Sequence, residues 1–271
     1  MRGHRAALAF AVVLALLCAA LPAVAQKQDD QPHMLTWVNV FKVHPGKSME
    51  FQKAFEKFDK PVLEKLRAEG TIVSWGLAYA MIGPPGAWQA WATTTDWASL
   101  GKIDAAFAAS HRAMSKEDIK ELVETFVGST DPDSQQTIVL RELVSEGSPD
   151  ATPKFLMLGL YKAKPGKGNL ATSMYKAYVA PVYKKLLADG AILGYGFGVQ
   201  DMHTDASWTH VGWLALSDLS QVDAVDAAFD QAEKDRPEGA NSTIRAAFMT
   251  WSKPGAHRDA LYRIVMYGAG K

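Results

Sequence analysis

Carboxylate and imidazole side chains are concentrated in one short segment of this 271-residue sequence. Asp201, His203 and Asp205 lie in the segment DMHTD, and His210 follows five residues later. Such groups can ligate a metal ion, but this spacing matches no recognised metal-binding motif. We therefore predict a solvated polar loop and no metal site, because Asp and Thr side chains favour turns.

His210 and Asn39 are the two candidates for a catalytic role. His210 alternates with Trp208 and Gly212, and an inward-facing His210 would serve as a general base or a haem ligand. Asn39 lies between aromatic residues and would orient a substrate by hydrogen bonding. The sequence supplies no partner for either residue, and it contains no HExxH motif and no EF-hand loop. The catalytic residues therefore stay unassigned.

Aromatic residues are the second group with a chemical use, because their rings bind flat apolar molecules. The candidates for a ligand-binding pocket are Trp37, Trp75, Trp91, Tyr195, Trp213 and Arg263. Asn39 would lie in the same pocket. If the strand faces that carry them point into a barrel, they would enclose an apolar cavity with few polar groups, the usual form of a small-molecule site. The alternative is that the same side chains fill the interior as hydrophobic core.

The other faces of the same segments are aliphatic or glycine-rich. Val38 and Val40 share one face, and Leu158 and Leu160 share the matching face in the second half of the chain. We predict that these aliphatic faces pack against helices. In GYGFG (194–198) the glycines share one face, which permits close approach of a ligand or of another backbone.

Arginine and lysine residues occur in matching pairs along the chain. Arg141 and Arg263 lie in apolar segments, where an inward guanidinium would bind a carboxylate and an outward one would pair with a surface acid. Lys47 and Lys167 follow a glycine at the start of a predicted helix, where free N–H groups attract anions. A phosphate loop needs more glycines than these segments have. We interpret both segments as tight turns, for which Pro and Gly are the usual residues.

The sequence that carries these candidates repeats itself. The segments KVHPGK (42–47) and KAKPGK (162–167) are 120 residues apart, and later aromatic and proline positions also match. After a two-residue insertion the offset becomes 122, which aligns DAAF at 104–107 with DAAF at 226–229. A match of this length indicates a duplication.

Each repeat predicts the same order of secondary structure. MLTWVNVFKV (34–43) is rich in β-branched and aromatic residues and ends near Pro-Gly, as a strand does. Phe51, Phe55 and Phe58 then recur at helical spacing, and Pro61 is expected to kink or break that helix. Two strands, one or two helices and a last strand follow. This order, β-α-β-β-α-β, is that of a ferredoxin-like unit, which leaves one sheet face bare for a second unit to cover.

Both repeats resemble the dimeric α+β barrel superfamily, which includes antibiotic-biosynthesis-monooxygenase-like, EthD-like and NIPSNAP-like domains. The resemblance rests on a first strand that ends in a Pro-Gly-Lys turn before an amphipathic helix, and it covers nearly the whole mature chain. It implies an α+β fold in which two tandem ferredoxin-like βαββαβ units form a pseudo-dimeric barrel within one chain. The resemblance lies in the pattern of strands, turns and aromatic residues, and it includes no catalytic motif, so it indicates the fold and not the function.

The sequence also predicts how the chain is divided. Residues 1–25 have the arginines, the apolar run and the Ala-Val-Ala end of a secretory signal peptide, so we expect a periplasmic or secreted protein without a membrane span after cleavage. Residues 26–32 would form a flexible mature N-terminus. The ferredoxin-like units are predicted at 33–147 and 154–271, with a polar linker at 148–153.

Composition narrows the function classes. Cys18 is the only cysteine and lies in the signal segment, so no disulfide or thiolate is expected in the mature protein. The sequence has 29 basic and 29 acidic residues and no basic patch, which argues against nucleic acid as a partner.

Three functions fit these observations. The leading one is a cell-envelope protein that needs no cofactor and binds a small apolar or aromatic molecule in or beside the barrel. The second is an enzyme, either a cofactor-independent oxygenase of the monooxygenase-like type or, as a variant, a haem protein, because chlorite-dismutase-like proteins also fuse two such units. The third is a structural role, with homo-oligomers formed through exposed sheet edges.

Overall fold

The structure is a computed structural model, and it describes residues 34–148, 151–202 and 207–269. The predicted signal peptide, the segment 26–32, and His203 and Asp205 lie outside the described residues. No helix within the described ranges is long and apolar enough to cross a membrane.

Eight antiparallel strands form a closed barrel with the order β1-β3-β2-β8-β5-β7-β6-β4. The strands of the first half are β1 (Leu35–Lys42), β2 (Ser74–Ile82), β3 (Ala87–Thr94) and β4 (Gln136–Gly147). Those of the second half are β5 (Phe155–Tyr161), β6 (Gly194–Gln200), β7 (His210–Leu216) and β8 (Arg258–Ala269). Each half has the predicted ferredoxin-like order, and the contacts β2–β8 and β4–β6 join the two sheets. Because the described barrel is closed, it leaves no free sheet edge. The structural role that we considered, in which homo-oligomers form through exposed sheet edges, therefore lacks the edges that it needs.

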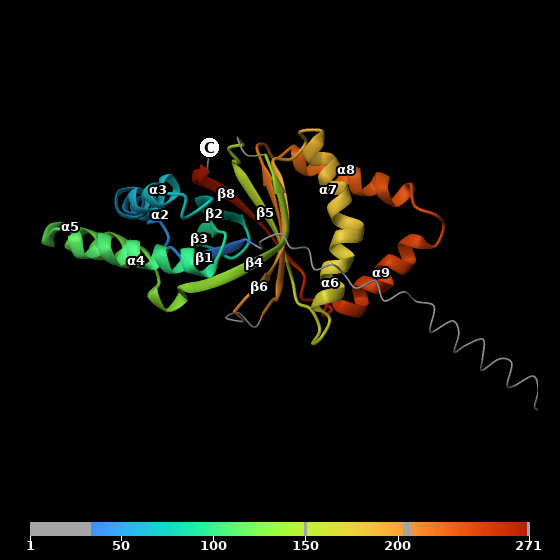
Figure 1. The fold of residues 1–271 in the computed structure, drawn as a ribbon, viewed down its shortest axis with the longest axis horizontal. Helices are drawn as coiled ribbons and strands as arrows, with labels where there is room; N and C mark the ends of the chain where they lie inside the picture. Colours follow the sequence, from blue (N-terminus) through green and yellow to red (C-terminus); the bar gives the residue numbers. More distant parts are fainter. Residues whose placement is uncertain (1–33, 149–150, 203–206, 270–271) are drawn as a thin grey trace, which may run out of the picture. The chain divides into compact units, whose positions relative to one another are not determined.

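The helices of the two halves match each other and cover the strands (Figure 1). The first half contains α2 (Ser48–Ala54), α3 (Lys60–Ala68), α4 (Trp97–Ala113) and α5 (Lys116–Leu122). The second half contains α6 (Gly168–Met174), α7 (Ala180–Ala188), α8 (Gln221–Lys234) and α9 (Ala240–Trp251). Figure 1 shows α2 to α5 and α6 to α9 on opposite sides of the barrel strands.

The helix predicted to kink or break near its proline runs on through a π-helical turn. This turn spans Phe55–Asp59 between α2 and α3, and Tyr175–Val179 between α6 and α7. Pro61 and Pro181 lie just after these turns. A proline has no N–H and its ring displaces the carbonyl one turn earlier, so a wider turn before it removes the conflict.

The two Pro-Gly-Lys segments are strand-to-helix turns, as predicted. Gly46 and Gly166 adopt φ angles of 79° and 72°, which only glycine adopts without strain. The backbone N–H of Lys47 donates to the carbonyl of His44 over 3.0 Å, and Lys167 donates to Lys164 over the same distance. The turns therefore mark equivalent corners of the two units.

The faces of the strands are reversed from the prediction. Val38, Val40, Leu158 and Leu160 point into the barrel, where they form one cluster with Trp91 and residues of β4 and β7. The other large aromatic residues of β1 to β3 instead pack under the helices. The interior of an eight-stranded barrel is only wide enough for side chains to fill it, whereas the layer between sheet and helices accepts bulky rings.

Two tryptophans inside the barrel lie flat against glycines of the neighbouring strand. A Cβ atom added to Gly196 would come within 2.4 Å of the Trp213 ring, and one added to Gly76 would come within 2.2 Å of the Trp91 ring. The glycine face predicted to admit a ligand or backbone therefore receives an indole at Gly196.

Candidate functional site

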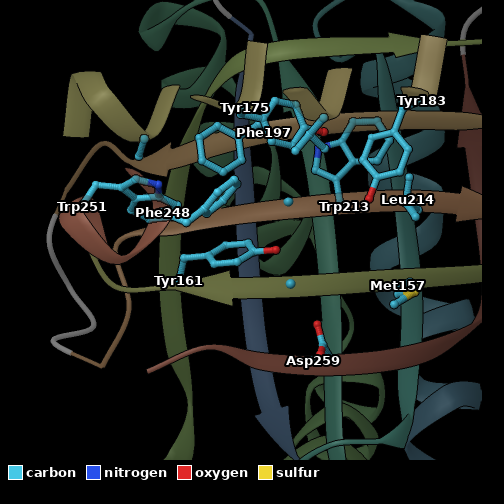
Figure 2. Close-up of a pocket in the computed structure, with 14 residues that line it drawn as sticks. Met157, Tyr161, Tyr175, Tyr183, Phe197, Trp213, Leu214, Phe248, Trp251 and Asp259 are labelled. Atoms are coloured by element: carbon cyan, nitrogen blue, oxygen red, sulfur yellow. The ribbon is translucent and has the colours of Figure 1, made fainter. Parts of the chain in front are cut away.

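A small hollow lies between the sheet and the helices of the second half (Figure 2). It has a volume of about 100 Å³, and its walls come from β5, β6, β7, β8, α6, α7, α9 and the π-helical turn between α6 and α7. We name it the tyrosine pocket after the three tyrosines among its aromatic lining residues, which are Tyr161, Tyr175, Tyr183, Phe197, Trp213, Phe248 and Trp251. Figure 2 shows the hydroxyl end of Tyr161 directed into the space between these rings.

Small residues line the pocket at positions where the first half has larger ones, although the ring of Trp251 packs on Tyr161 and Phe248 much as Phe51 packs on Phe41 and Phe126. Ala171 lines it where the first half has Phe51, a fully buried ring that packs on Phe41, Trp88 and Phe126. On the sheet side, two more small residues, Gly159 and Gly212, pair across β5 and β7 and also line the pocket.

The corresponding cross-strand pair in the first half is Asn39 with Ala90. A Cβ atom added to Gly212 would meet its nearest neighbours at 3.9 Å, which is ordinary contact, so the wall at this point accepts a methyl group without a clash.

The tyrosine hydroxyls stay protonated at neutral pH and act as hydrogen-bond donors or acceptors. Burial, with the nearby Asp259 carboxylate, raises the pKa of Tyr161 to about 12. Burial also raises the pKa of Tyr175 and of Tyr183. The Tyr175 hydroxyl donates to the carbonyl of Gly196 over 3.1 Å.

The indole of Trp251 adds a polar atom to this apolar wall. Its side chain is 2% exposed, and its Nε1 has no hydrogen-bond partner among the described residues. A buried N–H without a partner loses its interaction with water and gains nothing in return, so it is destabilising. Trp251 therefore offers the pocket wall a donor that is not in use.

A histidine-aspartate pair lies at one side of the pocket. Asp259 lines the pocket, and its Oδ1 is 3.1 Å from Nε2 of His257. The His257 ring stacks on Tyr161, with ring centroids 4.6 Å apart and planes 9° apart. His257 thus links the tyrosine pocket to an adjacent groove.

This adjacent groove, which we name the basic groove, has a volume of about 290 Å³. Tyr161 and Phe248 line both hollows. The other residues of the basic groove come from the end of β5, the end of α9 and the α9–β8 connection, and are Lys162, Met249, Ser252, Lys253, Pro254, Gly255 and His257. Small-molecule sites commonly measure roughly 300–1,000 Å³, so the two hollows have the size of a site only in combination.

The predicted ligand-binding residues are not brought together. Trp37 and Trp75 lie under the helices of the first half, close to Phe107 and Phe55, and not in the barrel interior. Tyr195 lies under the helices of the second half, 5.6 Å from the ring of Tyr183. These residues are separated because the strand faces that carry them point toward the helices of their own half and not into the shared barrel interior.

Trp91 and Trp213 do lie inside the barrel, and Trp213 also lines the tyrosine pocket. Arg263 is exposed, with its guanidinium 5.4 Å from the centre of the Phe155 ring. The outward alternative for Arg141 is confirmed, because its guanidinium makes two hydrogen bonds to Asp201 of 2.7 and 2.9 Å. Ligand binding by the predicted residues stays a prediction.

The two catalytic candidates are also separated from the pocket. Asn39 lies on the helix side of β1, and its Oδ1 accepts a hydrogen bond of 2.7 Å from the Thr137 hydroxyl at an exposed position. His210 does not face the barrel interior, because it lies under the helices of the second half, where its ring stacks on Phe197 and its Nδ1 is 2.8 Å from the Thr209 hydroxyl. Burial lowers the pKa of His210 to about 4, so its imidazole is neutral at pH 7.

The two imidazoles nearest the hollows do not offer an axial ligand for haem. His210 is 3% exposed and lines neither hollow, and Nε2 of His257 faces Asp259. Neither of these imidazoles therefore presents Nε2 to a space the size of a macrocycle. Among the described residues, no group of three or more His, Cys, Asp or Glu side chains is placed to hold a metal ion.

A buried carboxyl group inside the barrel escaped the sequence analysis. Glu142 of β4 is 6% exposed and accepts hydrogen bonds from the Thr36 hydroxyl over 3.2 Å and from Nε1 of Trp213 over 3.0 Å. The Thr36 hydroxyl is also 3.2 Å from that of Thr93. Burial raises the pKa of Glu142 to about 7.

The fold is shared with solved structures of low sequence identity. A candidate monooxygenase of Fusobacterium nucleatum subsp. nucleatum is 10% identical, with a TM-score of 0.59 over 88% of this chain and 94% of that chain. One from Lactobacillus acidophilus NCFM is 11% identical, with a TM-score of 0.56 over 88% and 96%.

An anthrone oxidase-like protein is 13% identical, with a TM-score of 0.51 over 89% and 94%. No protein-family profile matches the sequence, and no curated protein matches it either. At these identities the likeness establishes the fold alone, the tandem dimeric α+β barrel that the sequence predicted.

Proposed function

We propose that the protein binds a small aromatic molecule in the tyrosine pocket. The observation that carries this proposal is the hollow itself, whose walls combine aromatic rings with the small residues Ala171, Gly159 and Gly212. Aromatic walls favour a flat ring through offset and edge contacts. The hydroxyl of Tyr161 and the indole N–H of Trp251 supply polar groups that would orient such a ligand.

The fold neighbours support the same class of ligand. Two are described as monooxygenases and one as anthrone oxidase-like, and anthrones are fused aromatic compounds. A single ring would occupy the tyrosine pocket, and a larger molecule would extend past Tyr161 and Phe248 into the basic groove.

The proposal is tested by filling the pocket from the sheet side. Gly212→Leu directs an aliphatic side chain into the pocket that Gly212 lines, so we expect phenol and 2-naphthol to bind at least about tenfold more weakly than to the wild type. Binding is measured by tryptophan fluorescence and by ligand-observed NMR on the purified protein.

The matched control is Gly212→Ala, which restores the residue of the first half and leaves most of the space open. It is expected to keep binding within about threefold of the wild type. Equal binding by wild type and Gly212→Leu, or no binding of either compound to the wild type, would contradict the proposal.

A second function is favoured by the histidine-aspartate pair. His257 bonded to Asp259 beside Tyr161 has the arrangement of a general base held by a carboxylate. In a cofactor-independent oxygenase, such a base would remove a proton from an acidic O–H or C–H of the aromatic substrate. The resulting anion would then donate electrons to molecular oxygen, the oxidant.

His257→Gln tests this second function, because the first half carries Gln135 at the matching position. Oxygen uptake with anthrone is measured with an oxygen electrode, in parallel with anthrone binding. If His257→Gln lowers the rate of oxygen uptake at least about a hundredfold and leaves the affinity for anthrone unchanged, the result would support catalysis. No uptake by the wild type, or unchanged uptake in the variant, would reject it.

We also propose that the protein is exported. The apolar run before the Ala-Val-Ala segment supports this, and the expected cleavage follows Ala25. Mass spectrometry of the protein recovered from the periplasm or medium is expected to show Gln26 as the first residue. Recovery of the uncleaved chain in the cytoplasm would exclude export.

A further inference from the structure

The aromatic ring at the place of Phe51 comes from another helix in the second half, and it carries a polar atom. Phe51 of α2 packs on two rings of the first half, and Trp251 of α9 packs on their counterparts, Tyr161 and Phe248. Phenylalanine is wholly apolar, whereas tryptophan has an indole N–H that donates a hydrogen bond and cannot accept one. The second half therefore has a donor where the first half has none.

The rest of the protein makes no use of this donor. Trp251 is buried, and its Nε1 has no hydrogen-bond partner within the part of the chain that the structure describes. Its neighbours include the rings of Tyr161, His210 and Phe248, and an aromatic ring accepts an N–H only weakly. A buried N–H without a partner is destabilising, so a ligand that brings an acceptor removes a cost that the protein alone bears.

A second tryptophan shows that an unpartnered N–H is not by itself a site. Nε1 of Trp75 in the first half also has no partner among the described residues. It is covered by β8, because a Cβ atom built on Gly268 would clash with it, and Trp75 lines neither the tyrosine pocket nor the basic groove. Trp251 does line the tyrosine pocket, and Figure 2 shows its indole nitrogen turned toward the space between the rings. The hollow beside the N–H is what sets Trp251 apart.

The polar groups of the pocket differ in depth. Trp251 is 2% exposed, whereas the side chain of Asp259, which lines the same pocket and bonds His257, is 56% exposed. The acceptor that the protein supplies thus lies on the solvent side, and the indole donor lies on the buried side. A ligand that fits both must present an acceptor of its own to the buried side.

We infer that the indole N–H of Trp251 determines the specificity of the tyrosine pocket, by selecting aromatic molecules that carry a carbonyl oxygen, as ketones and quinones do. This inference rests on the proposed binding of an aromatic ring in the tyrosine pocket and adds the substrate class. A carbonyl oxygen has two lone pairs and no hydrogen, so it accepts from Trp251 without burying a further donor. The hydroxyl of Tyr161 is directed into the same space and can donate to the second lone pair.

The test compares two probes of nearly the same shape. 1-Indanone has a ring carbonyl, and indane has a methylene group in its place. Each is titrated into the purified full chain, labelled with ¹⁵N, and the shifts of the backbone amide resonances give the affinities. In the wild type we expect the indole N–H resonance of Trp251 to move further downfield with 1-indanone than with indane, because only the ketone accepts a hydrogen bond from it.

The decisive variant is Trp251→Phe, which removes the N–H and keeps an aromatic ring. We expect it to lower the affinity for 1-indanone, relative to that for indane, at least about fivefold. Comparing the two probes in each protein cancels any change in packing that affects both. The comparison of resonances in the wild type needs no variant, so the inference is tested even if Trp251→Phe does not fold.

Trp75→Phe is the matched control. It removes the other buried N–H without a partner from a place that lines neither hollow, so we expect the ratio of the two affinities to stay within about twofold of the wild type. Circular dichroism of both variants checks that they are folded. A ratio that falls as far in Trp75→Phe as in Trp251→Phe would assign the effect to packing and overturn the inference.

The remaining outcomes separate this inference from the proposed function. If both probes bind but the ratio is unchanged in Trp251→Phe, or the Trp251 resonance responds equally to ketone and hydrocarbon, the selection by Trp251 is refuted and ring binding stays intact. If neither probe binds to the wild type, the pocket itself is refuted and the inference with it.

Discussion

The two halves of the molecule have the same fold and different interiors between sheet and helices. In the first half Phe51 packs on Phe41, Trp88 and Phe126, and forms a continuous core. In the second half Ala171 takes the place of Phe51 in the sequence, and the ring of Trp251 contacts Tyr161, His210 and Phe248, the counterparts of those three residues. Both copies of the duplicated unit therefore place an aromatic ring here, from α2 in the first half and from α9 in the second, and the tyrosine pocket lies beside the second ring.

The barrel interior shows a second difference of the same kind. Glu142 of β4 bonds Thr36 and Trp213, whereas the equivalent position of β8 holds Ile264, which packs near Trp91 and Leu156. One end of the pseudo-twofold barrel thus carries a buried carboxyl group and the other is aliphatic. A duplication within one chain lets each half change on its own, which a symmetric dimer of identical chains does not allow.

The largest expected effect comes from removing the filled core of the first half. Phe51→Ala is expected to lower the free energy of unfolding by about 3–5 kcal/mol, because a fully buried ring is lost and the cavity relaxes only partly. Urea unfolding followed by circular dichroism measures the change. A cost below about 1 kcal/mol would mean that the first half tolerates a hollow and that the contrast between the halves has no energetic basis.

The second effect is a pH dependence caused by Glu142. Burial raises its pKa in the folded state from 4.5 to about 7, so the folded protein holds this proton more tightly than the unfolded chain. Stability is therefore expected to fall as the pH rises from about 4.5 through about 7, by about 3 kcal/mol from this group. The measurement is urea unfolding at a series of pH values.

Glu142→Gln is the control, because the amide resembles the protonated acid and does not titrate. Asp59, whose pKa burial also raises to about 7, contributes with the same sign, and His210, with a lowered pKa, contributes with the opposite sign. Both groups are unchanged in the variant, so the difference between the two curves isolates Glu142. Parallel curves for wild type and variant would show that Glu142 titrates normally.

The smallest effect concerns the paired strand positions Ala90 and Gly212. Gly212→Ala is expected to raise stability by about 0.5–1 kcal/mol, because a Cβ atom meets only ordinary contacts and the unfolded chain loses freedom. Ala90→Gly in the first half is expected to lower stability by a similar amount. Thermal unfolding of both variants checks the pair, and a destabilised Gly212→Ala would show that the open wall is already full.

The duplication and the fold were predictable because turns and periodicity are local. KVHPGK and KAKPGK mark the same corner, and the helical spacing of Phe51 and Phe55 predicts the helix that follows. The inner and outer faces of β1 were not predictable. Val38 points into the barrel and Phe41 points under the helices, so both faces are buried and apolar, and alternation alone does not say which is which.

The site could be predicted only in part. Trp213 was among the predicted residues and does line the pocket, whereas Trp251 and His257 were missed, because no motif marks them. The sequence feature that could have pointed to this region is a change of residue size between aligned positions of the two repeats, such as Ala171 in the second where the first has Phe51. Whether a small residue leaves a hollow or is filled by a neighbour depends on distant side chains, which the sequence alone does not place.

The central claim, that the second half binds an aromatic ligand and the first does not, is tested most directly by fluorine NMR of protein labelled with 5-fluorotryptophan. On titration with 2-naphthol, the resonances of Trp251 and Trp213 are expected to shift, because both residues line the tyrosine pocket. Those of Trp37, Trp75 and Trp88 are expected to stay, because they lie in the packed first half. Shifts confined to the first-half tryptophans, or no shift at saturating ligand, would contradict the account.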